Sequence, residues 1–162
     1  MSSNTKKNFR GQTQDFINKS VDIGEKRENT FKKNVELKTN KTLLKGGKYK
    51  QYDFKINGMK NIFIELKTYN YKICDRESFM IGCDKIQYFN WRKSLNPTIR
   101  IFLIFGFYDL INKQLLYKYI EIIDFLKISK YEKFYYLDKK HYNIPTAEML
   151  NIDGFFNILN SL

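Results

Sequence analysis

The first periodic segment of the chain predicts a long helix, from about Gln14 to Leu37. At helical spacing, one narrow face carries apolar or glycine positions and a single acid: Ile17, Val21, Gly24, Glu28, Phe31 and Val35. This face is expected to pack inward. An inward carboxylate at Glu28 would need a metal ion, a cation or water beside it.

Two strands joined by a turn are predicted next. Gly46-Gly47 precedes a strand over Tyr49–Ile56, and Asn57-Gly58 is a strong hairpin signal. The second strand, Asn61–Thr68, alternates clearly. Ile62, Ile64 and Leu66 line one face, and Phe63, Glu65 and Lys67 line the other.

The middle of the chain predicts one helix and two further strands. The helix covers Asp84–Lys93, with Ile86, Phe89 and Trp91 as apolar anchors and Pro97 after its end. Residues Arg100–Tyr108 form a nearly continuous apolar run, which indicates a central strand covered on both faces, and Gln114–Ile123 form the next strand.

The C-terminal part is rich in aromatic residues. It predicts a short strand or hairpin ending near Pro145, then short helices over 146–150 and 153–161, with Asp153 as a candidate N-cap. The order of elements predicts an α/β fold in which helices flank a mixed central sheet.

Length and composition limit the possible functions. A chain of 162 residues that is 43% hydrophobic suits one packed domain. It has no apolar stretch long enough to span a bilayer and no signal peptide, so we expect an intracellular protein that is not secreted: cytoplasmic, nuclear, organellar or virus-encoded. Cys74 and Cys83 are expected to be reduced thiols.

The formal net charge is +12, and residues 1–12 are predicted to form a basic tail. Such a charge attracts polyanions, of which nucleic acid is the commonest, although solubility or an AT-rich genome would also explain it. The residues expected to contact nucleic acid are lysines and one tyrosine in Lys-aromatic segments or near the candidate site: Lys45, Lys48, Lys50, Tyr69, Lys72 and Lys85. Ordinary amphipathic strands with buried rings would give the same interleaving of lysine and aromatic residues.

The candidate catalytic and metal-binding residues lie on the two predicted hairpin strands. Glu65 and Lys67 point to one face, and Asp53 lies on the neighbouring strand. Carboxylates on adjacent strands suit Mg²⁺, and a lysine beside them can orient an attacking water or offset charge in the transition state. A solvated sheet surface would also carry such charges. The inward Glu28, packed against the same sheet face, favours a metal site.

Taken in order, Gly24-x-x-x-Glu28, Gly46-Gly47, Asp53, Ile64-Glu65-Leu66-Lys67 and a later helix with Gln87 resemble the PD-(D/E)xK nuclease superfamily. The resemblance implies a restriction-endonuclease-like αβββαβ core over residues 14–123, followed by a C-terminal extension over 124–162, in a single nuclease domain. It implies that Asp53 and Glu65 bind Mg²⁺, with Mn²⁺ as a substitute, and that Lys67 is catalytic. Glu28 would support the metal and Gln87 would approach the site. Tyr52 stands where the family's nominal proline would be.

The leading hypothesis is a metal-dependent endodeoxyribonuclease acting on double-stranded or branched DNA. A site-specific enzyme of homing or restriction type is favoured over a resolvase of Holliday junctions. Either type is expected to work as a homodimer or higher oligomer, because two strands need two active sites. The alternatives are a non-catalytic nucleic-acid-binding module on the same fold and a structural or viral interaction protein.

Overall fold

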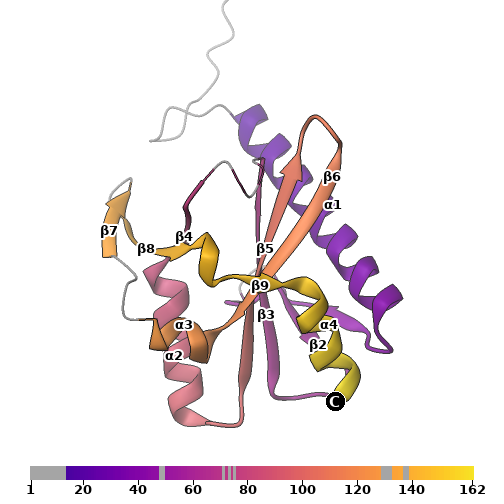
Figure 1. Cartoon of the computed structure of the whole chain (residues 1–162), viewed down its shortest axis with the longest axis vertical. Coiled ribbons are helices and arrows are strands. Elements are labelled where there is room, and N and C mark those ends of the chain that lie inside the picture. The colour runs from indigo at the N-terminus through magenta and orange to yellow at the C-terminus, as the bar shows by residue number, and fades with distance from the viewer. Residues whose placement is uncertain are drawn as a thin grey trace, which may run out of the picture.

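The computed structural model describes residues 14–47, 50–70, 72, 74, 76–128, 133–136 and 139–162. In that part of the chain a mixed six-stranded sheet has the order β1-β2-β3-β5-β6-β9 (Figure 1). Its strands are β1 (Leu43–Lys45), β2 (Phe54–Ile56), β3 (Ile62–Tyr69), β5 (Arg100–Asp109), β6 (Gln114–Glu121) and β9 (Leu150–Asn151). Only β3 and β5 run parallel, and the other neighbouring pairs are antiparallel.

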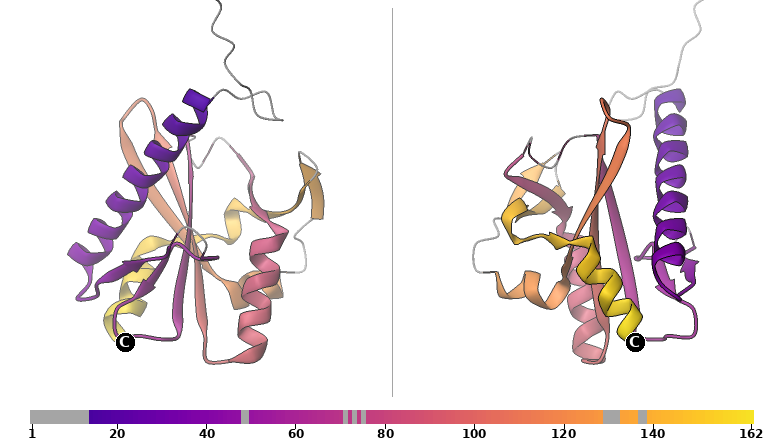
Figure 2. Two further views of the ribbon diagram at one scale, coloured as in Figure 1. Left: turned by 180° about the vertical axis from the view of Figure 1, so that it is seen from behind. Right: turned by 45° about the vertical axis from the view of Figure 1, so that its right-hand side comes forward.

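Helices and a smaller sheet cover the two faces of this main sheet. The helices are α1 (Gln14–Lys38), α2 (Cys83–Leu95), α3 (Ile122–Lys127) and α4 (Ile152–Ser161), with a 3₁₀ turn at Thr146–Glu148. The smaller sheet has the order β4-β8-β7, formed by β4 (Ser78–Gly82), β8 (Lys139–Pro145) and β7 (Lys133–Tyr136). Seen nearly along the sheet, α1 lies on one side, and α2, α3 and the smaller sheet lie on the other (Figure 2).

Two apolar cores hold these layers to the sheet, and the alternation of β3 and β5 divides their side chains between them. Ile64 and Leu66 of β3 pack with Phe31 of α1 and Phe155 of α4. The opposite face of β5 packs with α2, α3, β4 and β8 in the second core, which also contains Phe63. The predicted α/β fold with a mixed central sheet is confirmed, as is the double coverage of β5.

The predicted inward face of α1 holds for only part of the helix. Phe31 and Val35 are fully buried, but Val21 is 56% exposed, and the side chain of Ile17 lies outside the described residues. A cavity of about 640 Å³ lies between the middle of α1 and the β5–β6 hairpin, and Arg27 and Tyr108 help to line it. Val21 lines a separate cavity, where its side chain is open to solvent.

Several elements differ from the sequence-based prediction. The structure has strands β1, β4 and β9 and helix α3 where none was predicted. Strand β2 begins at Phe54, after three bent residues, rather than at position 49, which lies outside the described residues. Trp91 is 54% exposed and does not anchor α2. The N-cap of α4 is Asn151, whose side chain accepts from the backbone N–H of Asp153.

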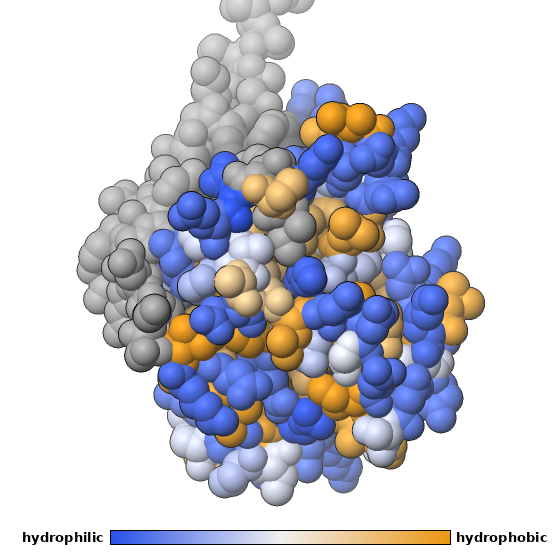
Figure 3. Space-filling model, in the orientation of Figure 1, coloured by the Kyte–Doolittle hydropathy of each residue, from blue (hydrophilic) through white to orange (hydrophobic). Residues whose placement is uncertain are grey.

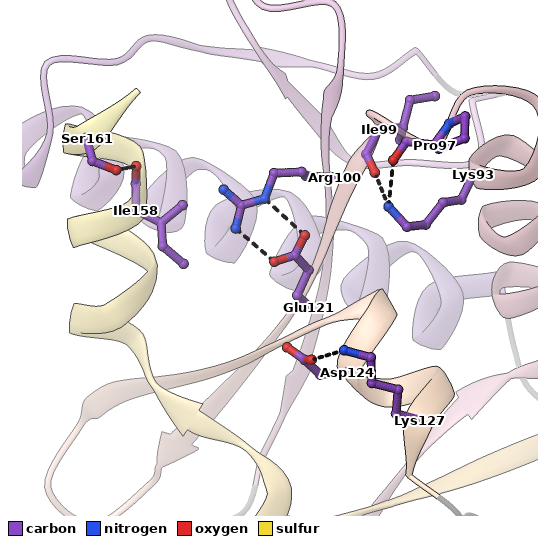
Figure 4. A network of polar contacts seen from close by, with 9 residues as sticks. All are labelled: Lys93, Pro97, Ile99, Arg100, Glu121, Asp124, Lys127, Ile158 and Ser161. Atoms are coloured by element: carbon purple, nitrogen blue, oxygen red, sulfur yellow. Dashed lines mark hydrogen bonds and ion pairs between the residues drawn. The ribbon is translucent and has the colours of Figure 1, made fainter.

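The C-terminal residues belong to the packed body of the protein. Strand β9 pairs with β6, and Phe155 and Leu159 are fully buried in the core on the α1 side. At the far end of the sheet a bidentate pair, Arg100 with Glu121, joins β5 to β6 with N–O distances of 3.0 and 2.8 Å (Figure 4).

Hydrophilic side chains cover most of the face drawn in Figure 3, and an apolar group marks the turn between β5 and β6, where Leu110 and Ile111 are exposed. Cys74 is exposed, and Cys83 is buried at the start of α2. Among the helices of the described residues, none combines the length and the apolar character needed to cross a bilayer.

Candidate functional site

The centre of the candidate site is a buried carboxylate on β3. Glu65 is 1% exposed and stands on the face of β3 that α2 covers, two positions after the core residue Phe63. Its Oε1 lies 3.0 Å from Lys67 Nζ, and its Oε2 lies 3.1 Å from Lys85 Nζ. Lys67 shares the strand face with Glu65, as the alternation predicts, and Lys85 comes from the first turn of α2.

Lys85 was predicted only as a contact to nucleic acid, so its place in this centre is a feature that the sequence did not reveal. Its Nζ donates to the Gln51 carbonyl oxygen as well as to Glu65, both at 3.1 Å. The position depends on where α2 starts and how it packs on β3. No spacing in the sequence encodes that contact between distant segments.

Asp53 lies across from Glu65, just before β2. Phe54 pairs with Ile64 and Lys55 with Phe63 in antiparallel register. Extending this register by one residue places Asp53 opposite Glu65. The Asp53 N–H donates to the Ile64 carbonyl at 3.0 Å, and the Gly46 N–H donates to the Asp53 carbonyl at 2.6 Å. The side chain is also fixed, because its Oδ2 accepts from the Leu66 N–H at 2.7 Å.

Gly46 has a structural reason to be glycine. An added Cβ would collide with the carbonyl oxygen of Tyr52 and press on the Tyr52 ring. The close approach of these two chain segments holds the Asp53 backbone in place, so the Gly-Gly signal in the sequence marks a contact beside the site as well as a turn.

The charges at this centre influence one another. Burial raises the pKa of Asp53 above its usual value, and the negative charge of Glu65 raises it further. Burial alone would lower the pKa of Lys67, but the attraction of Glu65, together with Asp53 and Asp84, outweighs burial and leaves the pKa raised. Lys67 is therefore a firmly protonated cation, and the two carboxylates repel each other at short range.

Glu28 occupies a separate part of the site. The prediction that α1 packs on the sheet face carrying Glu65 and Lys67 is wrong, because α1 covers the opposite face, with Ile64 and Leu66. Glu28 pairs instead with Lys45 of β1 at 2.7 Å, a hydrogen bond that raises the pKa of Lys45. Periodicity identified the inward side of the helix, but it carried no information on which face of the sheet the helix would choose.

A cavity of about 590 Å³ nevertheless joins Glu28 to Asp53. Glu25, Lys45 and Lys50 also line it, together with the backbone of the Gly-Gly turn. In the described residues no three His, Cys, Asp or Glu side chains lie close enough together to form a ready metal cluster. The carboxylates brought close to one another are those of Asp53 and Glu65, and Glu28 lines the same cavity as Asp53.

The other predicted site residues have varied surroundings. Gln87 is exposed on α2, and within the described residues no polar contact joins it to Asp53, Glu65 or Lys67. The Tyr69 hydroxyl donates to the Met80 carbonyl at 2.9 Å, and its ring packs on those of Phe79 and Phe107.

Burial also raises the pKa of Tyr69. The contacts of this residue are therefore those of a core residue, and they do not support the predicted role in binding nucleic acid. Lys72 forms an ion pair with Asp109 at 3.4 Å, Lys50 is exposed, and Lys48 lies outside the described residues.

A mixed six-stranded sheet and four helices in the described residues make this an α/β protein. The same fold is found in D212, a nuclease from a fusellovirus. The two structures superpose with a TM-score of 0.52 and 16% sequence identity, over 93% of this chain and 94% of that one. At this identity the likeness concerns the fold. No protein-family model and no curated protein sequence matches the chain.

Proposed function

We propose that this chain is a metal-dependent endodeoxyribonuclease of the PD-(D/E)xK type. The observation that carries the proposal is the buried Glu65 carboxylate, held between Lys67 and Lys85 and across from Asp53. A buried acid with two cations, beside a second acid whose pKa is raised, is an arrangement found at functional sites. The fold shared with a viral nuclease and the net charge of +12 agree with an enzyme that acts on DNA.

Asp53 and Glu65 have the chemistry to hold Mg²⁺, with Mn²⁺ as a substitute. Glu65 Oε1 is buried and lies 3.0 Å from Lys67 Nζ. A divalent cation would bind this oxygen as a ligand and offset the repulsion between Glu65 and Asp53 that contributes to the raised pKa of Asp53. Mg²⁺ needs only one or two protein carboxylates, since waters and substrate phosphate complete its shell.

The residues around Asp53 and Glu65 would have different roles in hydrolysis. Mg²⁺ held by Asp53 and Glu65 would polarise the substrate phosphate and lower the pKa of a bound water. Lys67 Nζ, protonated and beside Glu65, would orient the attacking water or offset the charge that develops on the phosphate. Lys85 would fix Glu65 by its Oε2, and the Leu66 N–H would fix Asp53 by its Oδ2.

Glu28 is proposed as a supporting acid on the far side of the shared cavity. Its ion pair with Lys45 is more than a quarter exposed on both side chains, at 27% and 40%. Exposed pairs contribute little to stability. The Glu28 carboxylate can therefore leave Lys45 at small cost and turn to a cation or to a metal-bound water.

The expected substrate is double-stranded or branched DNA, and the expected assembly is a homodimer, which would present one site to each strand. A site-specific enzyme would cut at a palindromic sequence, whereas a resolvase would prefer four-way junctions. The cutting pattern on a plasmid and on a synthetic junction distinguishes these two types.

Cleavage of plasmid and branched DNA with Mg²⁺, with Mn²⁺ and with EDTA tests the proposal. Cutting is expected with either metal, and Asp53→Asn and Lys67→Ala are each expected to abolish it while DNA binding is retained. Asp22→Asn and Lys33→Ala, which alter exposed charges on α1, are the matched controls and should cut normally. Undiminished cutting by the Asp53 or Lys67 variant, or no cutting by the wild type on any of these DNAs, would reject the proposal.

A further inference from the structure

A third cavity, of about 460 Å³, lies between the β2–β3 hairpin and α2. Four cations line it, and none of its lining residues in the described part of the chain is an acid. The cations are Lys50, Lys55, Lys60 and Arg92. Its size falls within the range of small-ligand sites, and its charge selects an anion.

Three aromatic rings line this cavity, together with the aliphatic side chains of Leu44, Ile56 and Met59. Phe63 is almost fully buried, with the Tyr52 ring 4.9 Å from it and the Arg92 guanidinium 5.2 Å over its face. Tyr88 of α2 also lines the cavity, and its ring lies 5.9 Å from that of Trp91. Rings next to cations bind nucleotides by stacking on the base and neutralising the phosphate.

The rings make the cavity suited to a base that is not paired. In a continuous duplex the faces of each base are covered by its neighbours, so only base edges and the backbone are open to a protein. A base must leave the stack before a protein ring can stack on it. Phosphate contacts alone would need the lysines but not the aromatic rings.

This cavity adjoins the proposed catalytic centre. Lys50 and Tyr52 line both it and the cavity that contains Glu28 and Asp53. Phe63 lies two residues before Glu65 on one strand face, a separation of about 6.6 Å along the strand. A DNA strand with a phosphate in the cavity that Asp53 lines would thus bring a neighbouring nucleotide to the cavity beside Phe63.

We infer that the cavity binds an unpaired nucleotide of the DNA strand next to the phosphate to be cut. The preferred substrate then carries a flap, a bulge or a branch point at the cleavage site. This inference rests on the proposed nuclease function and narrows it to DNA in which a base is available outside the helix.

Equilibrium binding in EDTA tests the inference independently of cleavage. The probes are a labelled duplex and the same duplex with a single unpaired thymidine, measured by fluorescence anisotropy. Wild-type protein is expected to bind the second probe more tightly. Tyr88→Ala and Arg92→Ala are each expected to weaken binding of that probe by about tenfold and to leave the paired duplex nearly unchanged. Lys33→Ala, an exposed lysine of α1, should bind both probes as the wild type does.

Trp91 supplies a second readout, since it is the only tryptophan of the chain and lies beside Tyr88. Its emission should change saturably with short oligo(dT) and not with inorganic phosphate. Equal affinity of the wild type for the two duplexes would overturn the inference, as would variants that weaken both equally. If inorganic phosphate produces the same emission change, the cavity binds an anion and not a base, and the inference is overturned. If the wild type binds the duplex with the unpaired thymidine more tightly but cuts none of the DNAs tested, only the nuclease proposal is contradicted.

Discussion

Replacing Lys85 with methionine tests whether the buried Glu65 side chain depends on both of the lysines beside it. The substitution keeps most of the apolar stem of the side chain and removes the ammonium group that lies 3.1 Å from Glu65 Oε2. It also removes the hydrogen bond to the Gln51 carbonyl, which helps hold the segment before Asp53. The free energy of unfolding should therefore fall.

The structure sets the size of this loss. Leaving a buried carboxylate without any partner costs about 3–5 kcal/mol. Here Lys67 remains 3.0 Å from Glu65 Oε1, and the Lys85 side chain is 21% exposed, so water screens part of the interaction. The loss should be nearer the cost of one hydrogen bond to a charged group, about 2 kcal/mol. For a chain of this length it lowers Tm by about 4–8 °C.

A double-mutant cycle in EDTA measures the interaction. Wild type, Lys85→Met, Glu65→Gln and the double variant are unfolded by heat and by urea. With a neutral amide in place of the Glu65 carboxylate, removal of the Lys85 charge should cost much less than it does in the wild type. Equal losses in the two backgrounds would refute the account, because the effect of Lys85 would then come from packing or from its hydrogen bond to Gln51. Added Mg²⁺ should restore more stability to Lys85→Met than to the wild type, since a cation replaces the missing charge.

Three further substitutions separate chemistry from folding. Asp53→Asn should raise the free energy of unfolding in EDTA at neutral pH and abolish cleavage. Burial and a neighbouring carboxylate raise the pKa of Asp53 in the folded state. Wild-type stability therefore falls as pH rises from the ordinary aspartate pKa of about 3.9 through the higher folded pKa. Urea titrations at several pH values should show that the stability gained by Asp53→Asn vanishes below that pH window. Gly46→Ala should cost about 1–3 kcal/mol and slow cleavage, because the new methyl group displaces the Tyr52 carbonyl beside the site; a fully active, equally stable variant would contradict this. Arg100→Gln breaks a partly exposed pair at the far end of the sheet, so it should cost about 1 kcal/mol by thermal unfolding with an unchanged cleavage rate.

The parts of the fold that the sequence predicted are those with a long, unambiguous pattern. In β3 the alternation assigned Ile64 to one face and Glu65 to the other, and the two cores follow that division. The apolar run of β5 required cover on both faces and has it. The extent of α1 was predicted to within one residue at its C-terminal end.

The unpredicted parts depend on contacts between distant residues. Strands β1, β4 and β9 have three, five and two residues, too few for alternation to be distinguished from a loop. Strand β4 exists because it pairs with β8, more than 50 residues later. The same reason explains why Lys85 was expected on the DNA-binding surface but not at the centre of the site.

The site residues differ in how strongly the surrounding backbone fixes their positions. β3 is paired on both sides, with β2 and β5, so the positions of Glu65 and Lys67 are set by the core. Asp53 lies one step beyond the regular pairing of β2, where three hydrogen bonds replace the missing ladder. Glu28 extends from the part of α1 where close packing gives way to a cavity, and a surface lysine holds it. A metal ion would thus meet two fixed carboxylates and one that can adjust, which is why substitutions at Asp53 and Glu65 should be more damaging to cleavage than one at Glu28.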